Sequence, residues 1–165
     1  MLFRSLLLGH YSYLNDPPSS LTDISPLKGM GLITLDLWGT PVTDLTPIET
    51  MKNLKSLTCP GRGLVIDLSF CADLKLTYLD CTGTRISDIS PLASIKTLTI
   101  LKMHRTLVTD LTPLQSLPLR ELICKFVPEG DTKVLRSIKT LETINGLPAK
   151  EFWKRVEAGD VPQAK

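Results

Sequence analysis

The residues of this chain that could do chemistry are four cysteines, two histidines and a set of recurring aspartates. The cysteines are Cys59, Cys71, Cys81 and Cys124. Four cysteines could form a disulfide framework or bind a metal ion. No pair shows Cys-x-x-Cys spacing, and the histidines are His10 and His104 alone. We therefore expect reduced, buried thiols and no metal, which favours a reducing, cytoplasmic compartment. Cys71 is the thiol we single out as potentially reactive.

The aspartates offer little for catalysis. Asp44, Asp88 and Asp110 recur at one place in successive repeats, which favours capping of a turn over a paired-carboxylate site. The sequence holds no phosphate-binding loop, no nucleophile elbow and no His-Glu-x-x-His motif. We therefore expect no enzyme, no catalytic residues and no cofactor.

An internal repeat places these residues. Its central leucine stands at Leu35, Leu57, Leu79, Leu101 and Leu122, in steps of 22, 22, 22 and 21 residues. A third apolar position follows two residues later, at Leu37, Cys59, Cys81, Met103 and Cys124. This alternation predicts a short strand in every copy, with the leucines and most of the cysteines pointing into a core.

The rest of each copy predicts a turn and a short helix. Asp-Leu or Asp-Ile is followed by Thr-Pro or Ser-Pro, as in residues 44–47 and 88–91. A Ser or Thr hydroxyl can cap free N–H groups, and proline suits the first helical position. The few residues left before the next leucine fit only a single 3₁₀ turn. One such coil cannot bury its apolar face alone, so the copies must stack as a solenoid.

The repeat resembles the leucine-rich repeat family, in the 22-residue bacterial class seen in internalin-like proteins. The likeness rests on residues 19–126 and on the Asp-Ile-x-Pro-Leu tail at 88–92. It implies an α/β solenoid: a leucine-rich repeat horseshoe with a parallel sheet on the concave face and short 3₁₀ or irregular turns on the convex face. Thr40, Thr84 and Thr106 stand where that class usually places Asn, which predicts a thinner hydrogen-bond ladder.

One leucine-rich repeat domain, residues 1–165, is expected to have three parts. Residues 1–31 form a degenerate N-terminal coil, where Tyr11 and Leu14 fit the pattern and Asp16 takes an inward place. Residues 32–126 are regular repeats, disturbed once by an extra residue near Val65-Ile66, with Leu64 as the inward residue. Residues 127–165 form a cap.

The cap is predicted to hold two helices and a last strand. Asp131 or Thr132 would cap the first helix, residues 141–144 would form the strand, and Pro148 would open the second helix. The second helix carries the Phe152-Trp153 pair, which favours packing over the open end of the solenoid. This end is also similar to repeat regions of large bacterial proteins that include serine/threonine kinases. The chain could thus be a detached C-terminal regulatory part of such a protein.

Function is expected on the concave sheet face, where leucine-rich repeat proteins characteristically bind partners. Outward residues of successive strands form columns, and the predicted partner-binding residues are Asp36, Trp38, Tyr78, Asp80, Lys102, His104 and Lys125. Trp38 suits a binding anchor or, alternatively, packs against Tyr13 and Pro60. Asp80 and Lys102 either pair or present alternating charge.

The expected partner is a protein. A net charge of +2 is too small to indicate nucleic acid, and no apolar run reaches the ~18–20 residues of a membrane span. A structural or self-associating module is the alternative, because a weak first coil leaves an edge strand that could form an edge-to-edge homodimer.

Overall fold

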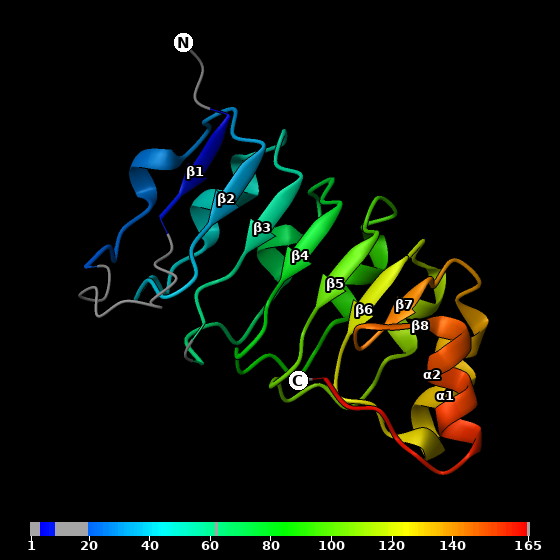
Figure 1. Cartoon of the computed structure of the whole chain (residues 1–165). Helices are drawn as coiled ribbons and strands as arrows, with labels where there is room; N and C mark the ends of the chain where they lie inside the picture. The colour runs from blue at the N-terminus through cyan, green and yellow to red at the C-terminus, as the bar shows by residue number, and fades with distance from the viewer. Residues whose placement is uncertain (1–3, 9–19, 62, 165) are drawn as a thin grey trace.

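The computed structural model describes residues 4–8, 20–61 and 63–164. One eight-stranded sheet runs in sequence order from β1 to β8 (Figure 1). The strands are β1 (Ser5–Leu7), β2 (Thr34–Asp36), β3 (Ser56–Thr58), β4 (Tyr78–Asp80), β5 (Ile100–Lys102), β6 (Glu121–Ile123), β7 (Thr143–Ile144) and β8 (Leu147–Pro148). All neighbouring strands are parallel except β7 and β8, which form a hairpin.

The strands align as the repeat predicts. Leu35, Leu57, Leu79, Leu101 and Leu122 stand in one register across β2 to β6, and Ile144 extends the row into β7. All of these side chains are buried, as are the inward residues two positions later. The solenoid with a parallel sheet is thereby confirmed.

Short 3₁₀ helices form the opposite side of the coils. They are η1 (Ser25–Leu27), η2 (Thr46–Thr50), η3 (Ser69–Cys71), η4 (Ser90–Ser94) and η5 (Thr112–Ser116). Proline stands at the start of all but η3, where Phe70 replaces it and is itself buried. None of the helices in the described ranges is long and apolar enough to cross a membrane.

The recurring aspartates hold the turns that start these helices. The Asp44 carboxylate accepts hydrogen bonds from the Thr46 hydroxyl at 2.7 Å and from its backbone N–H at 2.9 Å. Asp23, Asp67, Asp88 and Asp110 make the same pair of bonds. The hydroxyl therefore bonds the carboxylate rather than capping a free N–H, which corrects the expectation for these hydroxyls.

These bonds also set the acid response of the turns. The side-chain and backbone bonds from Thr46 hold the pKa of Asp44 below its ordinary value. A carboxylate with a lowered folded-state pKa stabilises the fold above its unfolded value of about 4, and this stabilisation is lost as the pH falls through the lowered pKa.

Threonine replaces the usual asparagine without replacing its contacts. The Thr40, Thr84 and Thr106 hydroxyls donate to carbonyls three residues back in their own coil, at 2.7–2.8 Å. Within the described part of the chain, the hydrogen bonds of these three hydroxyls stay inside their own coils. Other threonines bridge the coils instead: the Thr99 hydroxyl donates to the Thr77 carbonyl at 3.0 Å, and the Thr97 hydroxyl to the Leu76 carbonyl at 2.7 Å.

The first coil differs from its prediction. The strand beside β2 is β1, so Leu6 and not Leu14 stands in register with Leu35. Tyr11, Leu14 and Asp16 lie outside the described residues, as do His10 and Tyr13. Ile24 is buried before η1.

The irregular coil also differs in detail. Val65 is buried and Leu64 is only half-buried, so Val65 is the inward residue. The Val65 carbonyl accepts from the backbone N–H of Arg85, just as Ile86 accepts from Leu107 in the following coil. The extra residue therefore lies between Cys59 and Val65, upstream of the predicted place.

The cap closes the C-terminal end with two helices, α1 (Pro128–Ser137) and α2 (Ala149–Glu157). α1 begins before the predicted capping residues because Pro128 suits the first helical position. The Asp131 carboxylate instead reaches back to the Val127 N–H at 2.7 Å. Burial raises the pKa of Asp131.

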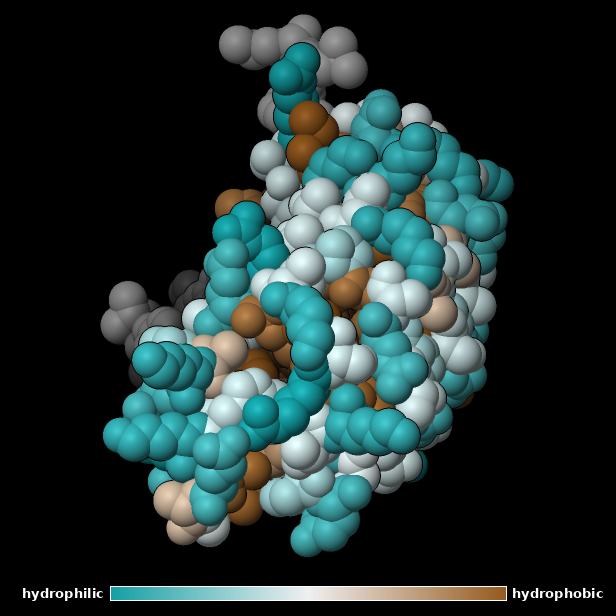
Figure 2. Space-filling view, turned by 90° about the vertical axis from the view of Figure 1, so that its right-hand side faces the viewer, coloured by the Kyte–Doolittle hydropathy of each residue, from teal (hydrophilic) through white to brown (hydrophobic). Residues whose placement is uncertain are grey.

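Aromatic packing joins the cap to the last coil. Phe126, Phe152 and Trp153 pack edge-to-face, with ring centroids 5.0–6.0 Å apart. Figure 2, a view onto this end, shows mainly hydrophilic residues with hydrophobic atoms visible in the gaps. The predicted C-terminal capping helix is therefore present as α2.

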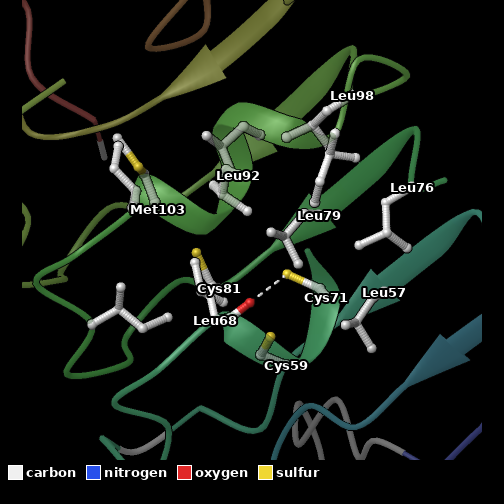
Figure 3. Packing of buried hydrophobic residues seen from close by; sticks show 14 of the residues in the cluster. Leu57, Cys59, Leu68, Cys71, Leu76, Leu79, Cys81, Leu92, Leu98 and Met103 are labelled. Atoms are coloured by element: carbon white, nitrogen blue, oxygen red, sulfur yellow. Dashed lines mark hydrogen bonds between the residues drawn. The ribbon is translucent and has the colours of Figure 1, made fainter. Parts of the chain in front are cut away.

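The cysteines serve the core. All four are buried free thiols, and Figure 3 shows Cys59, Cys71 and Cys81 packed among the leucines of adjacent coils. The Cys71 thiol donates to the Leu68 carbonyl at 3.0 Å, and burial raises its pKa to about 12. Because a reactive cysteine needs exposure and a lowered pKa, the expectation of reactivity at Cys71 is wrong.

Candidate protein-binding face

The sheet register places the outward residues in the predicted columns. Thr34, Ser56, Tyr78, Ile100 and Glu121 form the first column, and Asp36, Thr58, Asp80, Lys102 and Ile123 form the second. Strands in one register stand about 4.8 Å apart, so side chains along a column touch their neighbours. The face therefore acts as one continuous surface.

A small cluster occupies the middle of this face. The Lys102 ammonium lies 5.5 Å from the centre of the Tyr78 ring and 3.8 Å from a Glu121 carboxylate oxygen. The Tyr78 hydroxyl lies 3.4 Å from the Asp80 carboxylate. The expected alternative of an Asp80–Lys102 pair is not among the ion pairs of the described residues, because Lys102 turns to Glu121.

His104 extends the cluster toward the C-terminal coils. Its Nδ1 lies 3.2 Å from the Thr82 hydroxyl. Burial lowers the pKa of His104, opposed by the attraction of Asp80 and aided by the repulsion of Arg105 and Lys102. The imidazole is therefore neutral at neutral pH. The described residues contain no group of three or more metal-ligating side chains.

The Trp38 ring packs against glycines of the next two coils. A β-carbon on Gly61 would stand 2.9 Å from its ring, and one on Gly83 would stand 3.8 Å from it. The indole thus packs over glycine backbone, and its side chain is half-buried.

Two of the predicted partner-binding residues, Asp36 and Lys125, lie apart from this group. Asp36 is buried, and its carboxylate accepts from the Trp38 N–H at 2.9 Å, so it holds the turn after β2. Asp80 makes the same bond to the Thr82 N–H at 2.9 Å but stays half-buried. Lys125 lines a separate hollow with Val127 and the start of α1. The face therefore unites Trp38, Tyr78, Asp80, Lys102 and His104.

Sequence reasoning missed part of the face. Ile100 and Ile123 are half-buried strand residues that add apolar surface beside Tyr78 and His104. Both residues stand at outward positions of the predicted columns. Their apolar side chains were the signal in the sequence that could have identified them as part of the face. Glu121, the ion-pair partner of Lys102, was also in a column but was not singled out.

A hollow of about 630 Å³ adjoins the face at its C-terminal end. Its walls are His104, Ile123, residues 145–147, Arg155 and the tail segment 160–164. Figure 1 shows this tail leaving α2 and running back past the lower ends of the last strands. No sequence pattern predicted the path of the tail.

Comparison with solved structures identifies relatives of this architecture. Internalin C2 from Listeria monocytogenes str. 4b F2365 is 28% identical, with a TM-score of 0.66 over 75% of this chain and 56% of that chain. Internalin inlF from the same strain is 30% identical, with a TM-score of 0.64 over 76% of this chain and 37% of that chain. The chain therefore has an internalin-like leucine-rich repeat fold.

This internalin-like chain spans only part of the length of those relatives. No protein-family model matches it, and no curated protein does. The likeness of its C-terminal end to repeat regions of kinase-containing proteins stays a prediction.

The position of Trp38 depends on the missing side chain of Gly61. In a Trp153→Phe background, where Trp38 is the only tryptophan, Gly61→Ala should tilt the indole and shift its fluorescence emission, because the added β-carbon would stand 2.9 Å from the ring. Gly130→Ala is the matched control, since a β-carbon there meets nothing within 4 Å. An unchanged emission spectrum in Gly61→Ala would contradict this packing.

Proposed function

We propose that the protein is a non-catalytic protein–protein interaction module that binds its partner on the concave sheet face. The internalin-like repeat fold supports an interaction module, and the choice of face is our inference. The observation that carries it is a group of half-buried side chains: Tyr78 on β4, Ile100 on β5, and Trp38 in the turn after β2.

The chemistry of these three side chains suits a protein-binding surface. Trp and Tyr are enriched among interface residues that carry most of the binding energy, because they bury a large area with little loss of conformational freedom. Tyr78 is also steadied by Lys102 on one side and by Asp80 on the other. The mixed charges of Lys102, Glu121 and Asp80 would select the orientation of the partner.

A double substitution tests the face. Trp38→Ala with Tyr78→Ala removes both aromatic anchors, and we expect recovery of the partner in a pull-down to fall at least about tenfold, since each anchor typically contributes ~2 kcal/mol or more. The control carries Ile66→Ala with Leu107→Ala, two exposed apolar residues that lie outside the strands. Equal partner recovery from the double variant and the wild type would rule out the concave face.

Self-association is a second candidate. Among the described strands β1 pairs only with β2, and Leu7 on β1 is 70% exposed. A free strand edge can pair with the same edge of a second copy.

Sedimentation at rising concentration tests this candidate. We expect dimers that Leu7→Lys abolishes, because a charge on an edge strand opposes pairing. Ile66→Lys, at a side chain 69% exposed, should leave the dimer intact. A monomer at every concentration removes the self-association candidate.

A further inference from the structure

The hollow beside the concave face has walls made largely of apolar groups. Ile123, Leu147, Val161 and Pro162 line it, together with the methyl group of Ala164. Its volume of about 630 Å³ falls within the usual 300–1,000 Å³ of ligand sites.

The polar amides in its wall are already hydrogen-bonded. The Gln163 side chain donates to the Phe126 carbonyl at 2.8 Å and accepts from the Phe126 N–H at 3.3 Å. The Asn145 side chain accepts from the Cys124 N–H at 2.9 Å and donates to the Pro162 carbonyl at 3.1 Å. These bonds pin the tail, and they leave the two amides little to offer a ligand.

The charges in the wall are balanced as well. Arg155 bonds Glu151 at 3.0 Å and lies 3.9 Å from Asp160. His104 is neutral at neutral pH and shares a hydrogen bond with Thr82. A charged side chain entering the hollow would lose its hydration without gaining a free counter-charge, so an uncharged apolar one fits best.

We propose that this hollow is the anchor subsite of the concave face, and that it takes an uncharged apolar segment of the protein partner. This inference rests on the proposed function, because His104 and Ile123 belong to both surfaces. A partner lying along the sheet face would reach the hollow directly past these two residues. The tail segment 160–164 then forms one wall of the binding site.

Capped amino acids probe the hollow without any knowledge of the partner. The full chain is titrated with N-acetyl-leucine amide, N-acetyl-phenylalanine amide and their lysine and glutamate counterparts, and backbone amide shifts are followed by NMR. We expect saturable shifts at Ile123, Asn145 and Leu147 with the apolar probes, and at least about tenfold weaker binding of the charged probes. Absence of saturable shifts, or equal binding of the charged probes, would overturn the proposal.

Matched variants locate the effect. Val161→Trp fills the hollow from the tail and should abolish the shifts, whereas Val127→Trp places the same side chain at an exposed valine outside the hollow and should preserve them. Shifts that survive in Val161→Trp would assign probe binding to another place and refute the subsite.

Measurements of partner binding distinguish the proposed subsite from the proposed function of the whole concave face. A partner lost with Trp38→Ala and Tyr78→Ala should also bind Val161→Trp at least about tenfold more weakly. If its affinity is unchanged while the probes still bind the wild type, the hollow serves a small apolar ligand and the proposal fails, with the concave-face function intact. If the aromatic variant binds the partner normally, the concave-face function fails instead, whatever the probes do.

Discussion

The structure depends on one constraint: a coil of about 22 residues cannot bury its own apolar face. Each central leucine is shielded by the coils before and after it, so stability comes from contacts between neighbours rather than within a unit. Leu79 shows this best, because β4 pairs with β3 on one side and β5 on the other. At the C-terminal end, the cap covers the last coil in place of a further coil, because Phe152 and Trp153 pack against Phe126.

The same stacking creates the candidate binding surface. Because inward residues alternate with outward ones, the register that packs Leu79 also aligns Tyr78 and Asp80 with Ile100 and Lys102. The outward residues are free to vary without disturbing the core, so the fold itself does not name the partner. Trp38 is the exception, since its place depends on glycine in the neighbouring coils.

Periodicity predicted the regular coils well because burial repeats with the same spacing as the sequence. Periodicity failed to predict the structure where contacts between residues far apart in the sequence determine the position of a segment. The first strand is placed by pairing with β2, so Leu6 replaces Leu14 in the row. Cys71 looked reactive outside the cysteine column, yet it fills the inward side of η3. The hollow depends on Gln163 reaching Phe126, a contact 37 residues apart that no local pattern encodes.

The most direct test of neighbour-dependent stability compares the same truncation in two coils. Leu79→Ala in the middle coil should lower the free energy of unfolding by about 2–5 kcal/mol, measured by urea denaturation. Leu6→Ala in β1, where the leucine is only half-buried and the strand pairs with β2 alone among the described strands, should cost less than half as much. Equal costs at the two positions, or a smaller cost at Leu79, would contradict the account.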